Sequence, residues 1–246
     1  MNVIVVIPAA GLGTRMSAPA SGLKSKSKQF FELQGTPILI HTLRKFDECD
    51  RVSEIVVALR GNEKAAFEAL VAREHLRKPI RVVEGGEHRQ NSVANALRSL
   101  DADDDDIVLV HDAVRPFVDQ ETILGVIAGV EKYGAAIAGI PAIDTVKQVD
   151  RTADGAVVIA TVPREKMVLA QTPQGFRFAL IRNAFEEALA DGFVGTDEAS
   201  LIERGGGTVH VVMGSPRNIK ITTPADLDLA ELYISLDDRR KVGLSG

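Results

Sequence analysis

A glycine-rich segment with a single arginine follows the first apolar run of the chain. Residues 8–16 read PAAGLGTRM, directly after the β-branched run 3–7. Small residues and glycines allow backbone N–H groups to approach a phosphate, and Arg15 adds a positive charge. Position 16 is methionine, so the third glycine of the dinucleotide fingerprint is missing, and no Gly-Lys-Ser/Thr follows as in a P-loop. We predict an anion-binding turn that is neither a dinucleotide-binding fingerprint nor a P-loop. An ordinary strand-to-helix turn is the alternative.

A polar segment that contains three lysines comes next. Residues 17–29 read SAPASGLKSKSKQ and include Lys24, Lys26 and Lys28. Such a segment can be a solvated loop or a flap that lays lysines over bound phosphates. Lys28 is the best candidate for a fixed contact because it lies nearest to the phenylalanines at 30–31, which would anchor the chain.

A second glycine-containing turn follows a later strand. Residues 85–92 read GGEHRQNS. The two glycines allow close approach to a ligand, and Arg89 and Ser92 offer polar contacts at the start of a helix. A turn with a helix cap is the alternative, above all for Glu87 and Asn91.

Charged residues also occur singly beside apolar segments. Asp112 and Arg115 lie three positions apart in HDAVRP at 111–116, directly after a strand-like run. Such a pair could hold a metal–phosphate group and a second anion, or could form a plain salt bridge. Arg164 and Lys220 are similar isolated cations, which are more often surface charges than ligands.

The elements that must position these residues alternate between strand and helix. This β-α rhythm predicts an α/β fold with a mostly parallel sheet and helices on both faces. Each candidate segment follows a strand, and such sheets bind ligands beyond the carboxyl ends of their strands. The expected strands are 3–7, 53–59, 80–83, 107–111, 135–140 and 208–213, and the expected helices are 37–49, 62–74, 90–100, 119–132, 177–191, 197–204 and 223–236.

The rhythm breaks over residues 144–174. Two strand-like runs, 144–150 and 156–162, flank an Asp-Gly pair at 154–155, which is a strong hairpin signal. An isolated two-stranded hairpin is not stable alone in water, so it must lie on its own domain or on a second subunit. We expect a single domain over residues 1–246, with 144–174 as a β-arm excursion.

The composition is that of an ordinary globular protein. Lysine and arginine number 29 against 34 aspartate and glutamate, a net charge of −5, and 45% of the residues are hydrophobic. The mild acidic excess argues against a dedicated nucleic-acid binder. The single cysteine, Cys49, excludes an internal disulfide and a multi-cysteine metal site. We see no targeting segment or membrane span and expect a cytoplasmic protein.

Eight blocks together identify a family. They are PAAGLGTRM (8–16), SKQFFELQGTPILIHTL (27–43), GGEHRQNSV (85–93), VHDAVRP (110–116), DTVK (144–147), AQTPQGF (170–176), TDEAS (196–200) and NIKITTPADL (218–227). With these blocks in this order, the chain resembles the 2-C-methyl-D-erythritol 4-phosphate cytidylyltransferase family. The resemblance implies a Rossmann-like nucleotidyltransferase fold with a β-hairpin dimerisation arm. It also implies transfer of CMP from CTP to methylerythritol phosphate, with release of pyrophosphate, in isoprenoid precursor biosynthesis.

The resemblance also assigns roles to residues. Arg15 and Lys28 match the catalytic pair that stabilises the transition state. The residues that match CTP-binding positions are Ala9, Ala10, Gly11, Gly13, Thr14, Gly86, Glu87, Ser92 and Ala113. Those that match substrate-positioning residues are Asp112, Arg115, Thr145, Arg164 and Lys220. Mg²⁺, or another divalent cation, is expected on the CTP phosphates with Asp112 beside it.

The expected partners are CTP, methylerythritol phosphate and a second copy of the chain, with neither nucleic acid nor membrane. The arm would embrace the second subunit, so that Thr145 and Arg164 act across a homodimer interface. Three features depart from the family pattern: a longer 16–27 loop, Pro163 before the arginine, and Val114 in place of alanine. The alternatives are a ribitol-5-phosphate cytidylyltransferase, which shares most of the blocks, and a regulatory nucleotide-binding protein without catalysis.

Overall fold

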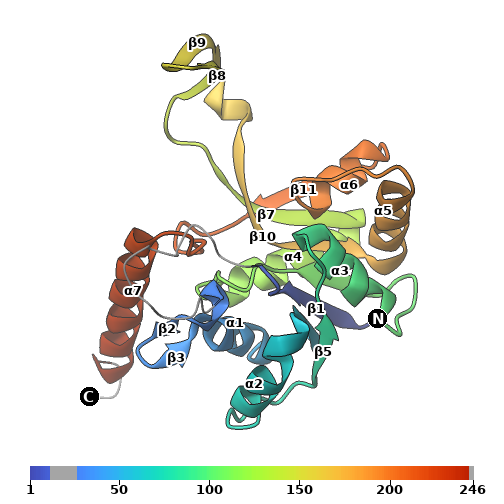
Figure 1. Ribbon diagram of the computed structural model, residues 1–246, viewed down its shortest axis with the longest axis vertical. Coiled ribbons are helices and arrows are strands. Elements are labelled where there is room, and N and C mark those ends of the chain that lie inside the picture. The colour runs from blue at the N-terminus through green and yellow to red at the C-terminus, as the bar shows by residue number, and fades with distance from the viewer. Residues whose placement is uncertain (12–26, 244–246) are drawn as a thin grey trace.

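A seven-stranded sheet forms the centre of the molecule (Figure 1). The computed structural model describes residues 1–11 and 27–243. The strand order is β11-β7-β10-β6-β1-β4-β5, and every pairing is parallel except those of β10. The strands are β1 (Val3–Pro8), β4 (Glu54–Leu59), β5 (Ile80–Glu84), β6 (Ile107–Val110), β7 (Ala135–Pro141), β10 (Val168–Arg177) and β11 (His210–Met213). The prediction of a mostly parallel sheet is confirmed.

Helices cover both faces of the sheet, as the β-α rhythm predicts. Successive residues of β1 point to opposite faces, so Val3 and Val5 enter one core while Ile4 and Val6 enter the other. The first core packs against α1 (Ile38–Asp47), α2 (Gly61–Val71) and α4 (Gln120–Tyr133). The second packs against α3 (Arg89–Arg98), α5 (Phe178–Ala190) and α6 (Glu198–Arg204). Apolar side chains on both faces explain why β1 reads as a continuous hydrophobic run.

Strand β10 is a strand of the main sheet that the sequence did not predict. It lies antiparallel between β6 and β7, and its ladder with β7 shifts register between Ala170 and Gln174. Within that bulge the Thr172–Pro173 peptide bond is cis. The strand carries a proline, a glycine and four polar side chains, a composition that does not resemble a central strand.

A two-stranded hairpin projects from one end of the sheet (Figure 1). It consists of β8 (Val146–Thr152) and β9 (Gly155–Val162), with the short helix η3 (Arg164–Lys166) leading back to β10. Gly155 has a φ of 142°, a region that only glycine adopts readily, and it pairs with Thr152 directly after the turn at residues 153–154, so the predicted hairpin is confirmed. We call residues 143–167 the arm.

The long helix α7 (Pro224–Gly243) closes a third, smaller core. It packs over β2 (Glu32–Leu33) and β3 (Thr36–Pro37), where Leu33, Ile38 and Ile221 are buried. Within the described residues, none of the helices combines the length and the apolar character that crossing a membrane requires.

Candidate active site

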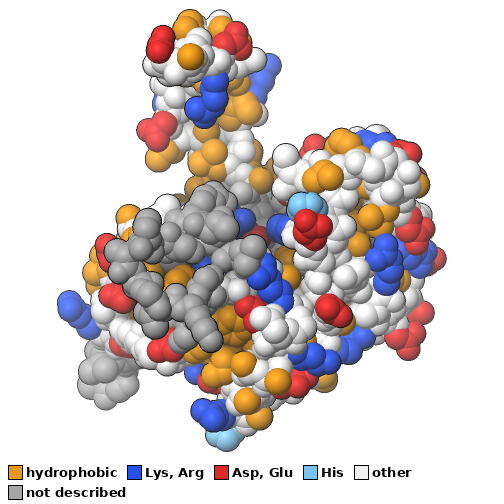
Figure 2. All heavy atoms as spheres, in the orientation of Figure 1, with side chains coloured by type: hydrophobic (Ala, Val, Ile, Leu, Met, Phe, Trp, Pro, Cys, Tyr) orange, Lys and Arg blue, Asp and Glu red, His pale blue; other side chains and the backbone are white. Residues whose placement is uncertain are grey.

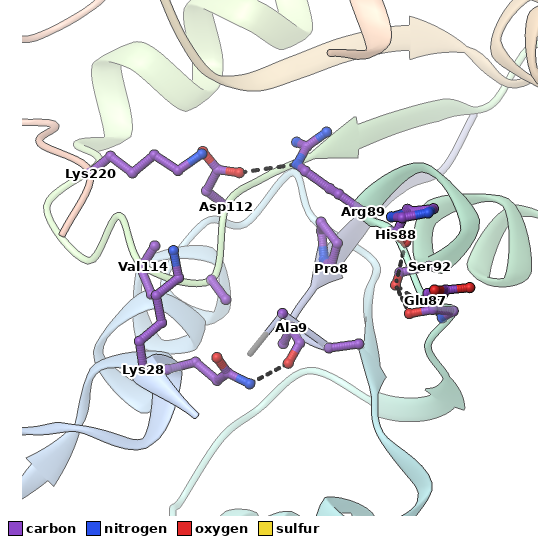
Figure 3. Close-up of a pocket in the computed structure, with 15 residues that line it drawn as sticks. Pro8, Ala9, Lys28, Glu87, His88, Arg89, Ser92, Asp112, Val114 and Lys220 are labelled. Atoms are coloured by element: carbon purple, nitrogen blue, oxygen red, sulfur yellow. Dashed lines mark hydrogen bonds and ion pairs between the residues drawn. The ribbon is translucent and has the colours of Figure 1, made fainter. Parts of the chain in front are cut away.

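A cavity of about 220 Å³ opens at the carboxyl ends of β1, β5 and β6 (Figure 3). This is the edge of the sheet at which parallel α/β folds bind ligands. Its lining consists of Pro8, Ala9, Ala10, Gly11, Lys28, Gln29, Gly86, Glu87, His88, Arg89, Ser92, Asp112, Ala113, Val114 and Lys220. The cavity therefore brings together Lys220 and four segments that the sequence reading singled out separately.

Seven of the nine predicted CTP-binding residues line this cavity. They are Ala9, Ala10, Gly11, Gly86, Glu87, Ser92 and Ala113. The other two, Gly13 and Thr14, lie outside the described residues. The turn before α3 is tight: a Cβ at Gly85 would collide with the side chain of Ala10, and one at Gly86 with that of Asn91. The Gly86 N–H donates to Ser92 Oγ at 3.0 Å, which closes this turn onto the helix start.

Lys28 reaches the cavity from the short helix η2 (Lys28–Phe30). Its neighbours hold this helix in place, because the buried Gln29 side chain donates to the carbonyl of Ala9 and Ser27 Oγ donates to Glu63. Figure 3 shows Lys28 on the side of the cavity away from Glu87. The other predicted catalytic residue, Arg15, lies outside the described residues.

Asp112 is buried and its carboxylate contacts three cations. The distances are 3.3 Å from Nε of Arg89, 3.2 Å from Nε of Arg115 and 2.9 Å from Nζ of Lys220. Figure 3 shows Asp112 between Lys220 and Arg89. Burial alone would raise the pKa of Asp112, but Arg89, Lys220 and Arg115 outweigh it and hold that pKa well below its usual range. Asp112 is therefore an ionised centre that orients three cationic side chains, rather than one half of an isolated salt bridge.

The described residues of the cavity do not form a protein-built metal site. Both oxygens of Asp112 already face cations, and Glu87 is the only other carboxylate among the lining residues. In the described part of the chain, no group of three histidine, cysteine, aspartate or glutamate residues could hold a metal ion. Asp112 therefore does not fit the role of a direct Mg²⁺ ligand in this arrangement.

A buried hydrogen-bond network holds the backbone of Asp112 in place. Nε2 of His111 lies 3.1 Å from the carbonyl of Arg115 and must donate, because a carbonyl only accepts. Nδ1 of His111 then accepts from the Thr172 hydroxyl at 3.1 Å, and the Thr172 oxygen accepts from the Asp112 N–H at 3.1 Å. Asn218 Nδ2 donates to the carbonyl of Thr172 at 2.8 Å. The strand end that carries Asp112 is thus tied to β10 and to the segment that carries Lys220.

His111 makes the stability of this network dependent on pH. Burial lowers the pKa of His111 from 6.5 to about 4, so the folded protein keeps it neutral where the unfolded chain binds a proton. The contribution of His111 to the free energy of unfolding is fully present above about pH 6.5. It decreases by on the order of 3 kcal/mol as the pH falls towards 4. We expect chemical unfolding of His111→Asn to show a correspondingly weaker pH dependence over this range. Parallel curves for the variant and the unsubstituted protein would contradict this expectation.

Three of the predicted site residues that the structure describes do not line the cavity. Thr145 and Arg164 are exposed on the arm, and Nη1 of Arg164 donates to the carbonyl of Ile143 at 2.8 Å. Arg115 is not in the lining, but it lies directly behind the lining residue Asp112. It donates to the carboxylate of Asp112 and, from its Nη1, to the Asn218 carbonyl at 2.7 Å. The described chain alone therefore assembles one part of the predicted site and leaves the arm residues outside it.

The structure also adds site residues that the sequence reading gave no assigned role. Arg89 lines the cavity and bridges Asp112 and the buried Glu198. Gln29 lines it as well, and Thr172 supports Asp112. Arg89, Glu198, Gln29 and Thr172 all lie inside the eight blocks. Of these four, only Arg89 was also singled out by its own position, as a polar contact at the start of a helix.

Known proteins resemble this chain over nearly its whole length. The family model described as IspD, 2-C-methyl-D-erythritol 4-phosphate cytidylyltransferase, matches residues 3–236. The curated protein of that name from Acidobacterium capsulatum is 56% identical, with 95% of this chain and 98% of the relative covered. The solved structure of the Francisella tularensis enzyme of that name is 37% identical with a TM-score of 0.78, covering 94% and 99%. That of the 4-diphosphocytidyl-2C-methyl-D-erythritol synthase from Anaerococcus prevotii is 31% identical with a TM-score of 0.80, covering 95% and 98%.

Proposed function

The chain belongs to the 2-C-methyl-D-erythritol 4-phosphate cytidylyltransferase family, and we propose how its residues carry out the family's reaction. The enzyme transfers the cytidylyl group of CTP to 2-C-methyl-D-erythritol 4-phosphate in isoprenoid biosynthesis. Of the two cytidylyltransferases that the sequence left open, the family model and the relatives support the methylerythritol enzyme over the ribitol phosphate enzyme. The observation that carries the division of roles is the position of Asp112 and its three cations opposite the glycine turns.

The reaction joins two anions. An oxygen of the methylerythritol phosphate attacks the α-phosphorus of CTP, a new P–O bond forms, and the bond to the β-phosphate breaks to release pyrophosphate. A phosphate monoester is largely dianionic at neutral pH, since its second pKa is about 6, so no general base is needed. The protein must instead overcome repulsion between the substrates, align them and stabilise charge on the transferring group.

The cavity residues divide these tasks. Small residues of segment 8–14 surround the triphosphate, while Gly86, Glu87 and Ser92 bind the cytidine. Lys28 acts with Arg15 on the charge that develops at the α-phosphate. Asp112, Arg115 and Lys220 hold the acceptor beside it, where the two cations attract its phosphate.

We place Mg²⁺ with the nucleotide rather than with the protein. Because Asp112 is engaged by three cations, the ion would enter with CTP as its phosphate complex, so Mg²⁺–CTP is the substrate. Asp112 then lies beside the metal–phosphate group without having to ligate it.

The arm is proposed to complete the site of a second subunit. Val157, Val158 and Ile159 are each more than half exposed, and Ile143 at the base of the arm is 79% exposed. Figure 2 shows such hydrophobic side chains interspersed with charged ones on the projecting arm. A closed two-fold dimer would cover these residues and bring Thr145 and Arg164 of one subunit to the cavity of the other.

Pyrophosphate release tests the substrate assignment. We expect release to require CTP, Mg²⁺ and methylerythritol phosphate together, with a far lower kcat/KM for ribitol 5-phosphate. Chelation of the metal should abolish release, and added Mg²⁺ should restore it. A higher kcat/KM for ribitol phosphate would overturn the assignment of the acceptor while leaving the fold and the CTP site intact.

A further inference from the structure

A buried carboxylate of α6 lies behind the active site. Glu198 is 2% exposed, and its Oε1 accepts from Nη1 of Arg89. Its Oε2 is buried and has no hydrogen-bond partner among the described residues. Burial raises the pKa of Glu198 while Arg89 opposes this effect. A half-satisfied buried carboxylate is costly to stability, so a role in fold stability alone does not account for it.

Arg89 is placed between this carboxylate and the acceptor site. Its Nη1 contacts Glu198 and its Nε contacts Asp112 at 3.3 Å, so the rigid guanidinium plane spans two carboxylates. Burial opposes the charge of Arg89, but Glu198 and Asp112 together raise its pKa further. The bridge fixes the position of the guanidinium, and through it the orientation of Asp112.

The start of α6, which carries Glu198, is itself held in place by hydrogen bonds. Asp197 caps α6 and accepts from Gln174 Nε2 at 2.8 Å, and the Ala199 N–H donates to Gln174 Oε1 at 3.0 Å. Gln174 is buried in β10, which pairs on both sides within the sheet. Gln90, next to Arg89, accepts from the Gly195 N–H at 2.9 Å, so the start of α3 is fastened to the loop before α6.

We propose that Glu198 is a positioning residue that acts through Arg89 to fix Asp112, and with it the cations Arg115 and Lys220 that attract the acceptor phosphate. The proposal rests on the acceptor-binding role of Asp112 given above. It follows that the charge of Glu198 matters for the methylerythritol phosphate side of the reaction and little for CTP. A residue that served only to stabilise α6 would affect both substrates alike, through the amount of folded enzyme.

The first test is Glu198→Gln, which keeps the shape of the side chain and removes its charge. We expect the KM for methylerythritol phosphate to rise about tenfold, with a KM for CTP within about twofold of the unsubstituted enzyme. A smaller amount of folded enzyme would lower the apparent kcat and change neither KM. The melting temperature should fall, because Glu198→Gln leaves Arg89 without one of its two carboxylate partners. Glu203→Gln, on the exposed face of the same helix, is the matched control and should leave both constants unchanged.

The second test asks whether the effect passes through Arg89. Arg89→Lys cannot bridge both carboxylates, so adding Glu198→Gln to it should cause little further loss. Additive losses in the double variant, or unchanged kinetics in Glu198→Gln, would overturn the proposal. Asp112→Asn distinguishes a failure of this proposal from a failure of the proposed function. If Asp112→Asn leaves the kinetics for methylerythritol phosphate unchanged, the proposed acceptor-binding role of Asp112 is wrong.

Discussion

Replacing Lys28 with alanine is expected to lower kcat by about 10²–10³-fold while the KM for CTP changes little. Lys28 lines the cavity beside the glycine turn of β1, where the triphosphate is proposed to lie. Its ammonium would act mainly on charge that develops in the transition state, and losing such an interaction lowers kcat rather than binding. The same outcome is expected for Arg15→Ala, the proposed partner of Lys28.

Steady-state kinetics over a range of CTP concentrations separates the two kinds of effect. Lys132→Ala is the matched control, because Lys132 is exposed in the last turn of α4, far from the cavity lining. If Lys28→Ala raises only the KM for CTP, Lys28 binds the ground state and the proposed role in catalysis is wrong.

Removing the guanidinium of Arg164 should reduce kcat/KM for methylerythritol phosphate by about 10²-fold, although Arg164 lies on the arm. A guanidinium can bind a phosphate at two points, and no lysine reproduces that geometry. Binding of CTP, measured by calorimetry on the same variant, should be unchanged. Arg151→Ala, in the exposed strand β8 of the same arm, is the control. If the kinetics of Arg164→Ala are unaltered, the arm does not contribute to the site through Arg164.

The fold could be predicted from the sequence wherever local pattern and burial agree. The continuous apolar runs at 3–7 and 107–110 became central strands with cores on both sides, because both faces of these strands are covered. The hairpin was predictable because an Asp-Gly pair between two strand-like runs is a strong local signal for a hairpin.

Strand β10 could not be predicted from local pattern because its polar side chains are satisfied by distant segments. Thr172 bonds with His111, Gln171 Nε2 donates to the carbonyl of Ser215 at 2.9 Å, and Gln174 contacts the start of α6. Each of these partners is more than twenty residues away in sequence. Without them the strand reads as a loop that contains a proline.

The site shows the same division between local and distant information. The pair Asp112–Arg115 is visible as a three-residue spacing, and the structure contains that ion pair. The contacts of Asp112 with Arg89 and Lys220 span 23 and 108 positions and depend on how β5, β6 and the segment before α7 meet. Family resemblance supplied Lys220, but it gave no role to Arg89 or Glu198.

The central claim is that the cavity of one subunit and the arm of another form a single site. Mixing Lys28→Ala with Arg164→Ala under conditions of subunit exchange tests it directly. In a mixed dimer, one site carries both substitutions and the other carries neither, so activity should recover to about one quarter of the unsubstituted enzyme for random pairing of equal amounts. If the arm served its own subunit, every site would keep one substitution. Demonstrated exchange without recovered activity would therefore contradict the shared site.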